Sequence, residues 1–168
     1  MGNNYDKAVA LYQELIAAAP SDADLHNSLG STYNGMGKTA EAEAEYDKAA
    51  QLNPASAGRY YYNEGAVLVN SNKMDEAATV LKKAVDALEN APDTDPTKAN
   101  AYFQYGMALL GKAQYKPDGS IVAAPGTVEA FQAYLKIAPN GPNAPQAQDT
   151  LKLLGAKLET EFKKAKKG

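Results

Sequence analysis

Histidine, cysteine and clustered carboxylates build most catalytic and metal sites, and this 168-residue sequence offers few of them. Its single histidine is His26, and it has no cysteine, which excludes thiol nucleophiles, disulfides and thiolate metal sites. A lone histidine has no second His or Cys with which to share a metal or activate a nucleophile. We therefore predict no catalytic residue, no metal site and no cofactor.

Three turns resemble ion or phosphate sites at first sight. Asp93-Thr94-Asp95 and Asp118-Gly119 lack the spaced oxygen ligands and closing glutamate of a calcium loop, so helix capping and turn formation explain both. Gly35-Met36-Gly37 is predicted to end a helix, because no strand precedes it and no Gly-Lys-Ser/Thr follows. A last group, interpreted as solvated carboxylates, alternates along one predicted helix: Glu41, Glu43 and Glu45.

Charge and hydropathy also limit the partners. The formal net charge is −3, which gives no broad attraction to phosphate. The basic run Lys163-Lys164-Ala165-Lys166-Lys167 has no interleaved aromatic residues, and its cations suit a helix C-terminus, so we predict no nucleic-acid partner. No stretch approaches the roughly 18 apolar residues that span a bilayer, so we predict no membrane insertion. The compartment stays open, because an exported form would carry its signal outside this chain.

A repeated pattern positions the remaining residues. Leu29-Gly30-Ser31-Thr32-Tyr33 is followed at fixed distances by Ala42, Tyr46, Ala49 and Pro54. This order resembles the tetratricopeptide repeat, with His26 where that family usually has Trp. The resemblance implies an all-α fold: a right-handed solenoid of about three and a half helical hairpins with a C-terminal capping helix.

The physical reason for the pattern is close helix packing. Gly30 and Ala42 are small, which lets two antiparallel helices cross closely, and the large apolar residues fill the space between hairpins. Pro54 ends the second helix because it has no backbone N–H to donate. The pattern recurs: Pro20 precedes Pro54 by 34 residues, and Gly65 follows Gly30 by 35.

We predict a single domain over residues 1–168. It divides into a half repeat at 1–20, repeats at 21–54, 55–91 and 92–142, an inserted loop at 111–126, and a capping helix with a basic tail at 143–168. The predicted helices lie near 5–19, 23–36, 38–52, 57–71, 73–89, 96–112 and 127–138. One more amphipathic helix is indicated from Ala144 to Phe162.

Local signals complete this outline. Asp95 before Pro96 predicts an N-cap followed by Pro at the first helical position. In the insertion, Tyr115 and Ile121-Val122 could form a short hairpin around a Pro-Asp-Gly-Ser turn. The segment from Thr127 to Pro142 resembles C-terminal units of bacterial tetratricopeptide proteins.

The first unit lacks its own first helix. Either the chain is a fragment of a longer array, which we favour, or another element covers the face that carries Leu11, Leu15 and Ile16.

Such solenoids carry a concave wall built from the first helix of each unit. The outward positions of those helices are amide-rich, with few charges, and become apolar in the last unit. The candidate peptide-binding residues are Asn27, Ser31, Asn34, Arg59, Tyr62, Asn63, Asn70, Asn100, Phe103, Gln104 and Met107. The basic carboxylate clamp known in this family is absent. Asn27 occupies its lysine position, and Asn100 and Gln104 occupy the positions of its later pair of basic residues.

The sequence therefore predicts a scaffold that binds a protein or peptide of unknown identity through its concave wall. Two alternatives stay open. The C-terminal helix or the inserted loop could cover the aromatic residues of the wall. Alternatively, the chain could be a self-assembly module that forms a homo-oligomer through its uncapped N-terminal helix or its convex face.

Overall fold

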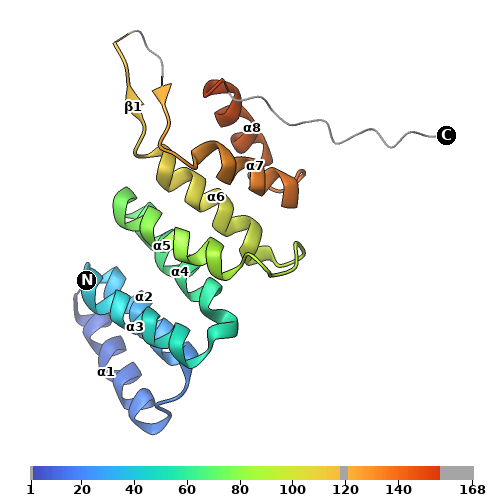
Figure 1. Ribbon diagram of the computed structural model, residues 1–168. Coiled ribbons are helices and arrows are strands. Elements are labelled where there is room, and N and C mark those ends of the chain that lie inside the picture. The colour runs from blue at the N-terminus through green and yellow to red at the C-terminus, as the bar shows by residue number, and fades with distance from the viewer. Residues whose placement is uncertain (1, 118–120, 156–168) are drawn as a thin grey trace, which may run out of the picture.

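The computed structural model describes residues 2–117 and 121–155 and shows a stack of helices with one short hairpin (Figure 1). Leu158, Phe162 and the lysine tail lie outside the described residues. The helices are α1 (Gly2–Ala18), α2 (Ala23–Gly35), α3 (Thr39–Leu52), α4 (Ala57–Asn70), α5 (Met74–Ala87), α6 (Pro96–Leu110), α7 (Thr127–Ile137) and α8 (Ala144–Leu153), with a 3₁₀ turn at Pro54–Ser56. The predicted ends of the first seven agree with these bounds within three residues.

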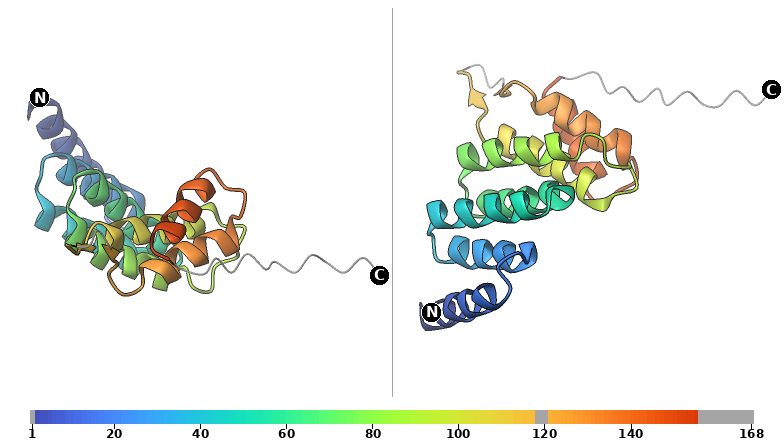
Figure 2. Two further views of the ribbon diagram at one scale, coloured as in Figure 1. Left: turned by 90° about the horizontal axis from the view of Figure 1, so that it is seen from above. Right: turned by 60° about the horizontal axis from the view of Figure 1, so that its bottom comes forward.

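The helices form a solenoid of successive pairs. Helix α2 packs on α3, α4 on α5 and α6 on α7, while α1 packs on α2 and α8 on α7. The pairs follow one another in chain order, and Figure 2 shows α1 and α8 at opposite ends of the stack. The all-α helical-repeat fold is thus confirmed. The division into repeats at 21–54, 55–91 and 92–142 stays a prediction.

Two equivalent turns join the helices within a pair. Gly37 and Asn72, 35 residues apart, both have positive φ, at 76° and 59°. The next amides close each turn: Lys38 N–H donates to the Tyr33 carbonyl and Lys73 N–H to the Leu68 carbonyl, both at 2.9 Å. This left-handed helix ending favours Gly or Asn, which explains why the Gly35–Gly37 segment is a helix terminus.

Close helix crossing accounts for the repeat glycines. A Cβ on Gly30 would lie 3.1 Å from the Tyr46 ring and 3.2 Å from the Ala42 carbonyl oxygen. Gly106 has the same relation to Phe131, at 3.0 Å. Since the facing residues are fully buried, a larger side chain at either glycine would force the helices apart.

The pattern of contacts between pairs sets the curvature. The first helices touch in succession, α2 with α4 and α4 with α6. No comparable contact joins the second helices, α3 with α5 or α5 with α7, all of which lie within the described residues. The row of first helices therefore forms the shorter, concave side, as expected for stacked hairpins.

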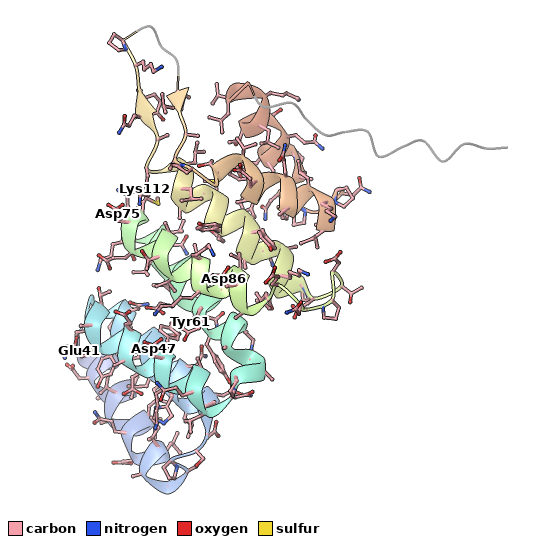
Figure 3. The ribbon with its side chains drawn as sticks, viewed as in Figure 1. Glu41, Asp47, Tyr61, Asp75, Asp86 and Lys112 are labelled. Atoms are coloured by element: carbon pink, nitrogen blue, oxygen red, sulfur yellow. The ribbon has the colours of Figure 1, made fainter. Side chains whose placement is uncertain are left out.

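The inserted loop forms the predicted hairpin. Strand β1 (Gln114–Tyr115) pairs antiparallel with β2 (Ile121–Val122), with Tyr115 opposite Ile121. Before it, the Lys112 ammonium lies 2.8 Å from the Asp75 carboxylate, which ties the end of α6 to the start of α5 (Figure 3). The Tyr115 side chain is 76% exposed, so its ring does not pack on the aromatic residues of the wall.

Candidate peptide-binding surface

Side-chain amides lie on each of the three first helices of the concave side. Asn27 on α2, Asn63 on α4 and Asn100 on α6 are all half-buried. The Asn63 Nδ2 donates to Asn27 Oδ1 at 3.1 Å, which links neighbouring units. Gln104 lies one helical turn after Asn100 and is also half-buried. We call Asn27, Asn63, Asn100 and Gln104 the amide row.

A neutralised ion pair borders the amide row. Arg59 Nη2 lies 2.7 Å from Asp24 Oδ1, and the Tyr60 hydroxyl donates to the same oxygen at 3.1 Å. The hydrogen bond from Arg59 lowers the pKa of Asp24. The Arg59 guanidinium also lies over the Tyr60 ring, 4.7 Å from its centroid. Both wall charges are thus paired with each other, so the surface offers a ligand little net charge.

Ser31 and Asn34 are turned towards the helix behind them. The Ser31 hydroxyl lies 2.8 Å from the hydroxyl of the fully buried Tyr46 on α3, and the Asn34 amide faces the same hydroxyl. Burial raises the pKa of Tyr46, and these polar contacts oppose the rise. Ser31 therefore satisfies a buried phenol within its own hairpin, whereas the Asn34 Nδ2 has no hydrogen-bond partner in the described structure.

Tyr62 and Asn70 differ in how far they are open to solvent. Tyr62 is half-buried against apolar clusters made by α4, α5 and α6, and burial raises the pKa of its phenol. Asn70 is exposed as the last residue of α4. Tyr62 thus presents only part of its ring.

Phe103 requires a correction, because its predicted outward position is wrong. Its side chain is only 6% exposed and packs against Phe131 and Tyr134 of α7, with ring centroids 5.8 and 5.3 Å away. Ala147 and Leu151 of α8 complete the same cluster. The ring is part of the core that joins α6, α7 and α8.

Met107 is also drawn into this packing. It is half-buried against the same cluster, and Gln146 of α8 donates to its sulfur at 3.6 Å. The open part of the wall consequently ends before Met107, as in the alternative in which the C-terminal helix covers the apolar end.

His26 lies between two helices, where its Nδ1 is 2.7 Å from Glu45 Oε2. The histidine is 7% exposed. The interpretation of Glu45 as a solvated carboxylate was wrong, because its pairing with His26 half-buries it. In the sequence, His26 and Glu45 are simply residues of two neighbouring predicted helices. Their separation along the chain does not reveal which carboxylate lies next to the imidazole ring.

The acidic loop at Asp93–Asp95 binds a cationic side chain of the protein itself. The buried Lys98 ammonium lies 3.0 Å from Asp93 Oδ1 and donates to the carbonyls of Glu89 and Ala91 at 3.1 and 2.7 Å. Asp95 caps α6 by accepting from Thr97 N–H at 2.7 Å, as predicted. Lysine is rarely buried, so the sequence did not indicate that Lys98 binds this loop.

Glu64 is a buried carboxylate that the sequence reasoning missed. It is 1% exposed and directly precedes Gly65, the place that Leu29 holds before Gly30. The sequence signal for a buried carboxylate was this glutamate, at a repeat position where the preceding unit has a core leucine. Burial raises the pKa of Glu64 to about 7, with the negative charge of Glu43 adding to the rise and Lys83 opposing it.

Two further findings limit the chemistry. Within residues 2–117 and 121–155, no three His, Asp or Glu side chains are grouped closely enough to hold a metal ion. None of the described helices combines the length and apolarity needed to cross a membrane.

The stacked helix pairs define a helical-repeat protein. The family model for the tetratricopeptide repeat matches residues 2–57 and 33–93, so the chain belongs to this family. Mouse protein O-mannosyl-transferase TMTC3 is 28% identical over 140 residues, which are 79% of this chain and 14% of the mouse protein. The chain therefore spans only a small part of that relative.

Two solved structures share the architecture. Pseudomonas aeruginosa PilF is 20% identical with a TM-score of 0.58, over 91% of this chain and 68% of that one. A double mutant of MamA RS-1 is 19% identical with a TM-score of 0.55, over 90% and 83%. At these identities the likeness shows the fold alone. Tetratricopeptide repeat domains bind protein partners.

Proposed function

We propose that this protein is a non-catalytic scaffold that binds an extended peptide segment of a partner protein along the amide row. The observation that carries the proposal is that each of three successive first helices bears a half-buried asparagine, Asn27, Asn63 and Asn100, two of which bond each other. Solubility alone would favour charged residues on such a wall, whereas this one is amide-rich.

Amides suit a peptide backbone chemically. Each carries two N–H donors and a carbonyl acceptor, so it can pair with a backbone C=O or N–H. The Asn27–Asn63 bond uses one donor and one acceptor of the pair. Asn100 and Gln104 have no hydrogen-bond partner within the described part of the chain. The row thus has unused bonding capacity on a half-buried surface, where an unmade hydrogen bond is costly.

The structure narrows the set of residues that we assign to binding. Asn27, Arg59, Tyr62, Asn63, Asn70, Asn100 and Gln104 stay in the proposed wall. Ser31 supports it through Tyr46, and Asn34 faces the same hydroxyl. Phe103 and Met107 are left out, because α7 and α8 cover them.

The test begins with a selection of short displayed peptides on the wild type. The affinity of the selected peptides is then measured by fluorescence anisotropy on two double variants. Asn63→Ala with Asn100→Ala is expected to weaken binding at least tenfold, which is about 1.4 kcal/mol. The matched control, Asn90→Ala with Asn140→Ala, removes two exposed amides outside the row and is expected to bind like the wild type. Equal affinity for both folded variants would refute the site.

Self-assembly is a second candidate because α1 exposes apolar residues. Leu11 is 54% and Leu15 41% exposed, beside a 40% exposed Tyr5. A further helix or a second copy packed on this face would bury them. Sedimentation across a wide concentration range tests it, and a strict monomer throughout would count against it.

A further inference from the structure

A cleft of about 360 Å³ opens between the second helices of two neighbouring units, on the side opposite the amide row. It exists because α3 and α5 lack the close backbone packing that joins the first helices. The lining residues are Thr39, Ala40 and Glu43 of α3, Glu64 and Leu68 of α4, and Glu76, Thr79 and Val80 of α5. Glu64 and Leu68 are almost fully buried, whereas Glu43 and Glu76 are about half exposed. The first two therefore form the floor and the other two the rim.

The floor carries an unpartnered carboxyl group. Glu64 Oε2 has no hydrogen-bond partner in the described structure, and no described Lys or Arg forms an ion pair with Glu64. A buried carboxylate without a partner is costly, so a residue of this kind needs a reason to be present. A ligand that brings a positive charge to the floor of the cleft would remove that cost.

The surrounding charges leave a deficit of cations. Glu43 and Asp47 share one ammonium, that of Lys83, at 3.6 and 3.5 Å. Lys83 also lies over the Tyr61 ring, 5.3 Å from its centroid, and Figure 3 shows Asp47 and Tyr61 between α3 and α5.

The second nearby ammonium is also engaged. Lys73 donates to Thr39 and lies 3.4 Å from Glu76. The cleft and its border thus hold four carboxylates, those of Glu43, Asp47, Glu64 and Glu76. The two ammonium groups pair with the other three carboxylates and leave Glu64 without a cation.

The shape and chemistry select the kind of cation. The described carboxylates are not grouped to hold a metal ion. Leu68, Val80 and Ala40 supply apolar walls between the charged rim and the charged floor. An alkyl chain that ends in an ammonium matches this order, because its methylenes pack on apolar surface while its head is a compact point charge.

We propose that this cleft binds an alkylammonium group, presented as a lysine side chain by a partner polypeptide, with Glu64 as its counter-ion. A polypeptide is favoured over a free amine because the cleft opens beside the exposed surfaces of two helices, where the chain that carries the lysine can lie. The site is separate from the amide row and does not depend on the function proposed for it.

The test is a titration followed by NMR of the Leu68 and Val80 methyl groups at pH 8, where Glu64 is ionised. The probe is the blocked pentapeptide Gly-Gly-Lys-Gly-Gly, and its matched control contains norleucine in place of lysine. n-Butylammonium chloride serves as the free amine. The lysine peptide is expected to give saturable shifts that the norleucine peptide does not give, and to bind more tightly than n-butylammonium.

Two variants assign the counter-ion. Glu64→Gln keeps the shape and removes the charge, and is expected to weaken lysine-peptide binding at least tenfold. Glu41→Gln removes an exposed carboxylate of α3 that does not line the cleft, and is expected to bind like the wild type. Glu43→Gln, at the rim, is expected to weaken binding less than Glu64→Gln and serves if the Glu64 variant does not fold.

The overturning results are equally specific. Absence of saturable shifts, equal shifts with the norleucine peptide, or unchanged affinity in folded Glu64→Gln would each overturn the site. If Glu64→Gln does not fold, unchanged affinity in Glu43→Gln would do so. Binding of n-butylammonium without binding of the lysine peptide would overturn the polypeptide source.

Discussion

The buried Glu64 carboxyl predicts an unusual dependence of stability on pH. Its pKa in the folded protein is about 7, against an ordinary value of 4.5. Below pH 4.5 both folded and unfolded chains hold the proton, and the group costs nothing. Between pH 4.5 and 7 the unfolded chain releases the proton while the folded chain keeps it, so the free energy of unfolding falls as pH rises. Above pH 7 both forms are ionised and the loss is complete.

The size of this loss follows from the same difference in pKa. At about 1.4 kcal/mol per pKa unit, the rise amounts to about 3 kcal/mol, which is a large part of the stability of a small domain. The side chain is 1% exposed, so solvent screening reduces this value little. Burial raises the pKa most, Glu43 and Asp47 on α3 add to the rise, and Lys83 on α5 opposes it.

The measurement is urea unfolding followed by circular dichroism, from pH 4.5 to pH 8, on the wild type and Glu64→Gln. The variant is expected to gain about 3 kcal/mol relative to the wild type across this range. Glu41→Gln reports the effect of removing one surface charge alone. A wild-type-minus-variant difference that is flat with pH would refute the reasoning, because it would mean that Glu64 ionises equally in both states.

Three other substitutions test the core packing, a buried lysine and the self-association surface. Phe103→Ala is expected to lower the free energy of unfolding by about 3–5 kcal/mol, because it empties a site between α6, α7 and α8; a loss below about 1 kcal/mol in urea unfolding would place the ring on the surface. Lys98→Met removes the hydrogen bonds to two loop carbonyls and is expected to cost about 1–3 kcal/mol, with faster hydrogen exchange in residues 89–95 as the specific readout. Leu11→Glu is expected to abolish any concentration-dependent association seen by sedimentation and to leave monomer stability nearly unchanged, since the side chain is 54% exposed; persistent association would move the contact to another face.

The helical repeat could be predicted from the sequence because its signals are local. The glycines at 30, 65 and 106 mark close crossings, Pro54 ends a helix, and Asp95 begins one. Pro54 and Asp95 act through backbone geometry within a few residues of themselves, and the glycines are recognised by the pattern that recurs around them. The periodic apolar positions then assign one face of each helix to the core.

The exposure of individual wall residues depended on distant parts of the chain. Helical periodicity places Phe103 on the outer face of α6, but α7 and α8 return after the insertion and bury it. Ser31 has an outward register and instead bonds Tyr46 of the next helix. Periodicity predicts direction within one helix, and it carries no information about which later element packs there.

The sequence by itself thus determined the helices, their order and the class of fold, because short-range backbone preferences and apolar spacing are enough for these. Only the tertiary structure decided that His26 pairs with Glu45, that Asn63 bonds Asn27, and that Glu64 lies unpaired at the floor of a cleft. The physical reason is that the cost of a buried polar group depends on the partners that folding brings within hydrogen-bond distance.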